Sequence, residues 1–275
     1  MNTRAASRLF LVVAAAAAGA HAQDAATAWQ DLYLRAQRAA GAHDYAAAEQ
    51  AFQQALHEAE RFGRNDSRVA STLNGLGLVY KDAKRYPEAD TALRRALEIL
   101  EGGATAGSVD VADITFTLAS VLVEQGRQQA AIPLFGQSLS IYEQVTGGQS
   151  VKSASAHCAI GEAYLALKAW SDAERPLKRC ADLREADGGV LSPALGDALY
   201  NLALVYEKEG RYALAEPRYR LAEKIRESTL GITSPAFAQA LEAHAALLKL
   251  MGRDKEAARD ETLAAAIRRG ARKQK

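Results

Sequence analysis

Apolar and polar residues follow one another along most of the chain with the spacing of amphipathic helices. In Ala198–Tyr206 and in Ala215–Ile225, apolar residues fall three and four positions apart, so each segment carries one apolar stripe. Short breaks marked by Gly126, Gly210 and Gly252 separate such segments. With only 6 prolines in 275 residues, the composition also favours helix almost throughout. The pattern therefore predicts pairs of antiparallel helices joined by short turns.

Three series of small side chains recur at an interval of 41 and then 42 residues. The series are Ala48, Ala89, Ala131, Ala173, Ala215 and Ala257; Ala55, Ala96, Ser138, Cys180, Ala222 and Ala264; and Ala36, Gly77, Ala119, Gly161, Ala203 and Ala245. A fixed period of this length indicates a solenoid, here with six repeats. Small residues at these positions would let neighbouring helices approach closely, and a larger side chain would cost about 1–3 kcal/mol.

The start of each repeat carries a residue that can cap a helix. Asp66, Ser108, Ser150, Ser192 and Ser234 stand 42 residues apart, each just before a helical segment. Their short side chains can accept hydrogen bonds from the unpaired N–H groups of a first helical turn, so we interpret them as N-caps. The repeats are predicted near 29–65, 66–107, 108–149, 150–191, 192–233 and 234–270, within a solenoid over 23–270. Pro133, Pro176 and Pro217 fall about one turn inside second helices, where we expect a kink or a late start.

Two stretches of the sequence carry a family resemblance. "LNGLGLVYKDAKRYPEADTALRRAL" (Leu73–Leu97) and "LYNLALVYEKEGRYALAEPRYRLA" (Leu199–Ala222) resemble the tetratricopeptide repeat, in the 42-residue form found in kinesin light chains and in many bacterial proteins, here of an exported type. The likeness runs roughly over residues 29–269. It implies an all-α fold, a right-handed superhelical solenoid of about six helix-turn-helix repeats, and a non-catalytic scaffold for protein–protein interaction.

The resemblance also implies a binding groove, because in this family the first helix of each repeat lines the concave face. Residues one turn apart on these helices would face the groove: Tyr33, Gln37, Asn74, Lys81, Phe116, Ser120, Glu162, Tyr200, Asn201 and Glu207. Amide side chains can pair with a peptide backbone, and aromatic rings supply contact area. For Phe116 and Tyr200, packing against neighbouring helices is an equal alternative. Acidic residues outnumber lysines on these faces, so we predict an extended peptide or protein partner that is neutral or basic.

The first residues have the layout of a secretory signal peptide. Arg4 and Arg8 precede an apolar run from Leu9 to Ala20, and the small-x-small triplet Ala20-His21-Ala22 follows it. The run is shorter than the ~20 residues that a membrane span needs, and no later segment is apolar for long enough to span a bilayer. We therefore predict a signal peptide over 1–22 and an exported product, periplasmic or, as the alternative, secreted.

The sequence contains no motif that is typical of a catalytic, metal or cofactor site. His43, His57, His157 and His244 show no metal-binding spacing, and no nucleophile–base motif is present, so neither an enzyme, a metal nor a cofactor is predicted. A formal charge of +1 argues against nucleic-acid binding through bulk charge. The basic tail 271–275 is interpreted as solvated. Cys158 and Cys180 fall in one repeat, where either a disulfide or a small buried thiol accounts for them.

Taken together, these features predict a non-catalytic scaffold of the cell envelope that holds a protein or peptide in the groove of a repeat solenoid. The alternative is an accessory protein that binds envelope glycan or cell-wall material, aided by the basic tail.

Overall fold

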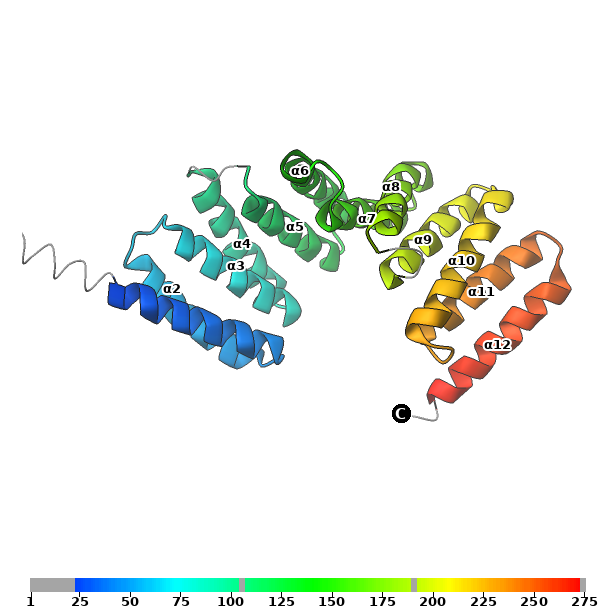
Figure 1. Cartoon of the computed structure of the whole chain (residues 1–275), viewed down its shortest axis with the longest axis horizontal. Helices are drawn as coiled ribbons and strands as arrows, with labels where there is room; N and C mark the ends of the chain where they lie inside the picture. The colour runs from blue at the N-terminus through cyan, green and yellow to red at the C-terminus, as the bar shows by residue number, and fades with distance from the viewer. Residues whose placement is uncertain (1–22, 104–106, 189–191, 273–275) are drawn as a thin grey trace, which may run out of the picture. The chain divides into compact units, whose positions relative to one another are not determined.

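The computed structural model describes residues 23–103, 107–188 and 192–272, and the predicted signal peptide 1–22 lies outside these ranges. All regular secondary structure in the described ranges is helical, which confirms the all-α fold class (Figure 1). A first helix over 23–41 is followed by α2 (Tyr45–Glu60), α3 (Ser67–Asp82), α4 (Tyr86–Glu101), α5 (Val109–Glu124), α6 (Gln128–Thr146), α7 (Val151–Ala166), α8 (Trp170–Gly188), α9 (Pro193–Lys208), α10 (Tyr212–Leu230), α11 (Pro235–Leu250) and α12 (Asp254–Arg272).

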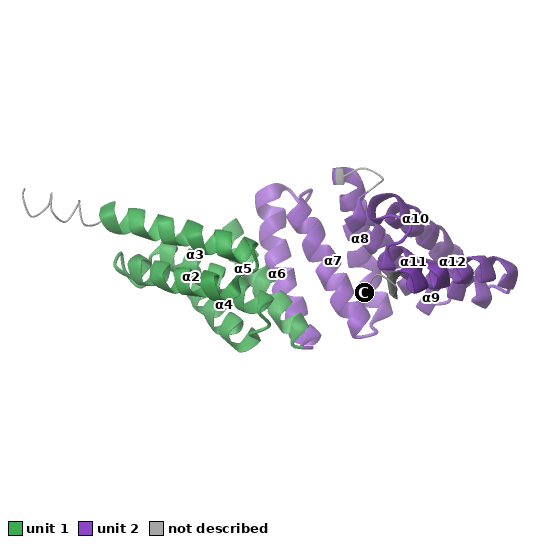
Figure 2. Cartoon of the chain, turned by 90° about the horizontal axis from the view of Figure 1, so that it is seen from below, with its two compact units in different colours: residues 1–125 green, residues 126–275 purple. Residues whose placement is uncertain are grey.

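The helices fall into two compact units, residues 1–125 and residues 126–275 (Figure 2). In unit 1 the first helix and α2 precede α3, α4 and α5, and α3 packs mainly on α4. In unit 2 the main contacts join α7 with α8, α9 with α10, and α11 with α12, and each pair also packs on the next. Within each unit, consecutive helix pairs therefore stack as in a solenoid.

The predicted period is reproduced by the helix boundaries. Helices α3, α5, α7, α9 and α11 each have 16 residues and begin at Ser67, Val109, Val151, Pro193 and Pro235, 42 residues apart. The predicted caps are confirmed: the side chains of Asp66, Ser108, Ser150, Ser192 and Ser234 each accept a hydrogen bond from a backbone N–H in the first turn.

The small side chains lie where helices meet, as predicted. The alanines, Ser138 and Cys180 of the three series are all buried, with at most 1% of their surface exposed. A Cβ atom built on Gly77 would lie 2.6 Å from Leu93, and one on Gly161 would lie 2.5 Å from Leu177. Because real Cβ atoms do not approach that closely, the missing side chain sets the separation of α3 from α4 and of α7 from α8.

The turn inside each repeat also follows the period. One residue of each turn has a left-handed backbone: His43, Lys84, Gly126, Lys168, Gly210 and Gly252, with φ between 58° and 73°. An aromatic residue opens the following helix at Tyr45, Tyr86, Trp170 and Tyr212.

Of the two outcomes expected at the internal prolines, a kink or a late start, the late start is wrong. Helix α6 begins at Gln128, well before Pro133, and α8 and α10 likewise begin before Pro176 and Pro217. The first turns of α8 and α10 pack on α7 and α9 through buried alanines such as Ala173 and Ala215, and this burial outweighs the loss of one backbone donor at the proline. No helix among the described residues has both the length and the apolar composition needed to cross a bilayer.

Candidate functional site

Three of the predicted groove residues meet at one hollow in unit 1. This hollow has a volume of about 300 Å³ and is called the unit 1 hollow below. Its lining comes from the first helix, α2 and α3, and consists of Tyr33, Gln37, Ala40, Phe52, Asn74, Gly75, Leu78, Val79 and Asp82. The structure therefore brings Tyr33, Gln37 and Asn74 together, although Asn74 is 37 positions from Gln37 in the sequence.

Tyr33 is held by two aromatic neighbours. Its ring centroid lies 5.3 Å from that of Trp29 and 5.5 Å from that of Phe52, the second in an edge-to-face arrangement. Burial raises the pKa of the Tyr33 phenol, and the negative charge of Asp110 raises it further. The hydroxyl therefore stays protonated and can donate a hydrogen bond.

Asn74 offers an unused hydrogen-bond acceptor to the same hollow. Its Oδ1 atom is buried and has no hydrogen-bond partner within the protein. Leaving such an acceptor unpaired costs about 1–3 kcal/mol, so a donor supplied from outside the chain would be stabilised there. Backbone N–H groups of a peptide are donors of the required kind.

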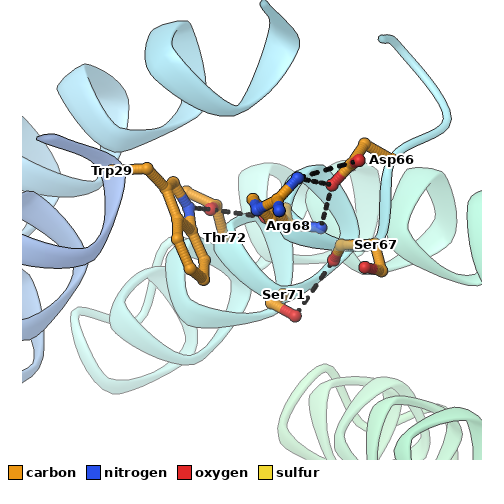
Figure 3. Close-up of polar contacts among 6 residues, drawn as sticks. All are labelled: Trp29, Asp66, Ser67, Arg68, Ser71 and Thr72. Carbon is orange, nitrogen blue, oxygen red and sulfur yellow. Dashed lines mark hydrogen bonds and ion pairs between the residues drawn. The ribbon is translucent and has the colours of Figure 1, made fainter. Parts of the chain in front are cut away.

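The first helix is fixed to α3 by side chains next to this site. Figure 3 shows Trp29 donating from Nε1 to the Thr72 hydroxyl, over 3.0 Å, and Arg68 paired with the capping residue Asp66. The Arg68 guanidinium lies 4.1 Å from the centre of the Phe62 ring. The Trp29–Thr72 bond joins the first helix, which carries Tyr33, to α3, which carries Asn74.

The other predicted residues of unit 1 lie outside the hollow. Lys81 is half-buried on α3 and is paired with Asp82 at 3.5 Å. Phe116 and Ser120 are half-buried on α5, where the Ser120 hydroxyl donates to the backbone oxygen of Phe116.

In unit 2, two predicted residues bond to each other across repeats. The Asn201 amide donates to the Glu162 carboxylate over 3.2 Å, which links α9 to α7. The pKa of Glu162 is raised, because protein atoms displace water around its carboxyl group and Asp197 adds a like charge. Acidic charge thus gathers on this pair of first helices.

Tyr200 is engaged in packing. Its ring lies 5.6 Å from that of Tyr219, edge to face, and the Arg226 guanidinium lies 4.4 Å from its centre. Glu207 is also committed: it accepts a hydrogen bond from the Tyr219 hydroxyl at 3.0 Å and pairs with Lys208. For Tyr200 the packing alternative is therefore the better description.

Comparison with known proteins identifies the repeats. Models of the tetratricopeptide repeat match residues 32–102, 110–186 and 196–229, more than half of the chain. The chain belongs to the tetratricopeptide repeat family.

Relatives carry the same kind of repeat. Kinesin light chain-related protein 3 of Arabidopsis thaliana is 25% identical over 166 residues, which cover 60% of this chain and 25% of that protein. The chain thus matches only about a quarter of the length of this curated relative. Among solved structures, BtubC (BKLC) of P. vanneervenii superposes with a TM-score of 0.70, at 18% identity, over 82% of this chain and 91% of that one. A Rap protein complexed with Competence and Sporulation Factor does so with a TM-score of 0.56, at 17% identity, over 90% and 76%.

One set of contacts between tetratricopeptide repeats was missed in the sequence. Arg85 pairs with Glu49 of the preceding repeat at 2.7 Å and covers the ring of Tyr80, whose hydroxyl donates to the same carboxylate. Arg211 repeats this arrangement in unit 2, with Glu174 at 2.6 Å and the ring of Tyr206. A Tyr followed five residues later by Arg was the available signal.

A larger hollow of unit 2 was also not predicted. It has a volume of about 880 Å³ and lies among α6, α7 and α8 of the tetratricopeptide array. Its lining includes His157, Arg175 and Arg179 but none of the predicted groove residues. Second helices contribute most of its wall, whereas the prediction considered first helices alone.

The two cysteines lie on the paired helices of one repeat. Cys158 on α7 and Cys180 on α8 are joined as a disulfide, with 5.2 Å between their Cα atoms. Cys180 is fully buried in the core between α8, α9 and α10. Cys180 is therefore both a small buried residue of the series and one half of the disulfide.

Proposed function

We propose that this protein is a non-catalytic scaffold of the cell envelope that binds an extended peptide segment of a partner protein, with the unit 1 hollow as part of the binding surface. The buried, unpartnered Oδ1 of Asn74 carries the proposal, because it is an acceptor that the fold leaves open beside an aromatic wall. Family membership supports protein binding in general.

The charge around the hollow supports a neutral or basic peptide. Asp82 lines the hollow, and Asp110 is close enough to raise the pKa of Tyr33. Acidic side chains in and near the hollow attract the Lys and Arg residues of a ligand and repel its Asp and Glu residues. The repulsion would be strongest at low ionic strength.

The first prediction concerns peptide binding to the unit 1 hollow. A displayed library of random peptides is selected on the full mature chain, and neutral, basic and acidic members are compared by titration. Asn74→Leu should lower the affinity for the selected peptides about tenfold or more, which corresponds to about 1.4 kcal/mol of binding free energy. The variant should be at least as stable as the unmodified protein, because it removes a buried acceptor that has no partner. Tyr33→Phe should also weaken peptide binding, because it removes the hydroxyl that can donate a hydrogen bond and keeps the ring.

Thr91→Ala provides the matched control, since Thr91 is exposed on α4 away from the hollow. Its variant should bind like the unmodified protein. Equal binding by Asn74→Leu would show that the hollow is not the site, and tighter binding of acidic than of basic peptides would show that the charge preference is wrong. Retention on purified wall material that is unaffected by Asn74→Leu would favour the glycan-binding alternative.

A further inference from the structure

Three side chains that can ligate a metal converge between the last helices of unit 2. Glu223 lies on α10, His244 on α11 and Asp260 on α12, and these helices pack one on the next (Figure 1). One ligand atom from each residue lies within 4.8 Å of the other two. The three side chains are 16%, 8% and 23% exposed, so the cluster is largely shielded from water.

The repeat register shows that two of the three residues, His244 and Glu223, replace apolar ones. His244 occupies the position before the buried small residue Ala245, where the other first helices from α3 onward have Leu76, Leu118, Ile160 and Leu202. Glu223 follows Ala222, where other repeats have Leu56, Leu97, Leu139 and Ala181. Burying polar groups at core positions costs free energy unless they are bound to something. Packing alone therefore gives no reason for both changes to face each other.

The geometry within the cluster suits coordination better than hydrogen bonding. Nδ1 of His244 lies 2.9 Å from Oε1 of Glu223 and 3.1 Å from Oδ2 of Asp260. Neither contact is aligned as a hydrogen bond, and both ring nitrogens of His244 and Oε1 of Glu223 are buried without a hydrogen-bond partner. Ligand atoms that each lie about 2.1 Å from one tetrahedral metal ion are about 3.4 Å apart, so a small outward shift of the two carboxylate oxygens would accommodate the ion.

The charge balance also leaves room for a cation. Burial raises the pKa of the carboxyl groups of Glu223 and Asp260, and Glu256 on α12 adds negative charge near Asp260. Arg220, one of the cations on α10, lowers the pKa of both carboxyl groups but does not offset their burial, and it also pairs with Glu216 at 3.7 Å. Burial lowers the pKa of His244, but the two carboxylates outweigh it, so a proton on the imidazole is the competing way to balance them.

We infer that Glu223, His244 and Asp260 form a binding site for one divalent transition-metal ion, with Zn²⁺ as the best match. One imidazole and two carboxylates are a ligand set that Zn²⁺ accepts, at three positions of a tetrahedron with the fourth left open. The ion would clamp the last repeat to the one before it, because its ligands come from both. Binding would therefore stabilise the folded state of unit 2.

The test uses the full mature chain without an affinity tag, freed of metal by chelation. Zn²⁺ is titrated by calorimetry, Co²⁺ is followed by its visible absorption, and thermal unfolding is recorded with and without Zn²⁺. One equivalent of Zn²⁺ should bind with a Kd of about 10 µM or below and raise the unfolding temperature. His244→Leu should weaken binding by more than about 100-fold and abolish the thermal shift.

His244→Leu is chosen because it restores the residue type of the other repeats, so the metal-free variant should fold at least as stably as the unmodified protein. His157→Gln is the matched control: it removes a largely buried histidine that has a carboxylate neighbour, Glu143 at 3.5 Å, and it should bind Zn²⁺ normally. The inference is overturned if the unmodified chain takes up no Zn²⁺, or if His244→Leu binds it as tightly. In either case the imidazole carries a proton instead of a metal.

Discussion

Gly161 shows how the absence of a single methyl group sets the distance between two helices. A Cβ at this position would lie 2.5 Å from the branched side chain of Leu177. In the next repeat, Ala203 stands at the position of Gly161 and Tyr219 at the position of Leu177, and both belong to one core cluster. A flat ring leaves space for the methyl group where a branched chain does not. The period predicts a small residue here, and the facing side chain decides how small.

Gly161→Ala is therefore expected to destabilise the protein by about 1–3 kcal/mol, through overpacking against Leu177. Gly136→Ala, in α6, should have the opposite effect and stabilise by about 0.5–1 kcal/mol, because a Cβ there meets nothing within 4 Å. Urea unfolding of both variants, followed by circular dichroism, measures the two effects. A stabilised Gly161→Ala variant would refute the close approach of α7 and α8.

The two histidines on first helices, His157 and His244, have different neighbours that the sequence does not indicate. The sequence treats His157 and His244 alike, as isolated histidines on first helices. In the structure His244 faces two carboxylates from α10 and α12, whereas His157 faces Glu143. Their partners come from other helices, at distances in sequence that no local motif records.

At the level of helices, the contacts of α7 with α6 and α8 make stability depend on pH. Burial lowers the pKa of His157, Glu143 on α6 opposes this, and Arg175 and Arg179 on α8 lower it further. The folded state thus holds the imidazole neutral more firmly than the unfolded chain does.

The expected sign follows from this lowered pKa. Above the unfolded value of about 6.5 both states are neutral at His157; as the pH falls below it, the unfolded state takes up the proton first and the free energy of unfolding decreases. His157→Gln should therefore lose less stability than the unmodified chain between about pH 7 and pH 5. Exposed His57→Gln serves as the control, and chemical unfolding at each pH gives the comparison. An unchanged difference across this range would contradict the burial of His157.

An ion pair of the same kind joins two successive repeats in unit 1 and two in unit 2. The Arg85–Glu49 and Arg211–Glu174 pairs join successive repeats, each with a tyrosine ring beneath the guanidinium. Both arginines are exposed to water, so solvent screening keeps the contribution of each pair to stability small. The buried small residues and the leucines, isoleucines and aromatic residues around them supply the larger part.

At the level of the whole molecule, we propose that export and disulfide formation belong together. Protein isolated from the periplasm of an expressing cell should begin at Gln23 and contain no free thiol, because an oxidising compartment allows Cys158 and Cys180 to pair. Intact-mass measurement and thiol labelling under denaturing conditions check both points. Export is disproved if the chain is recovered only from the cytoplasm with residues 1–22 attached.

Labelling of the Cys158→Ser variant provides the control for this experiment, since it leaves one thiol at Cys180 in every compartment. Two reactive thiols in periplasmic protein would contradict the pairing while leaving export intact.

The sequence by itself determined the all-α class, the repeat, the caps at Asp66 and its equivalents, and the burial of the small residues. These features depend on local spacing, which recurs in every repeat and is therefore readily distinguished from a chance pattern. Only the tertiary structure decided which side chains share a site: that Asn74 is left unpaired beside Tyr33, that Tyr200 packs on Tyr219, and that His244 meets Glu223 and Asp260. Such meetings depend on the facing residues of different helices, and a periodic pattern fixes which face is buried but not what lies opposite.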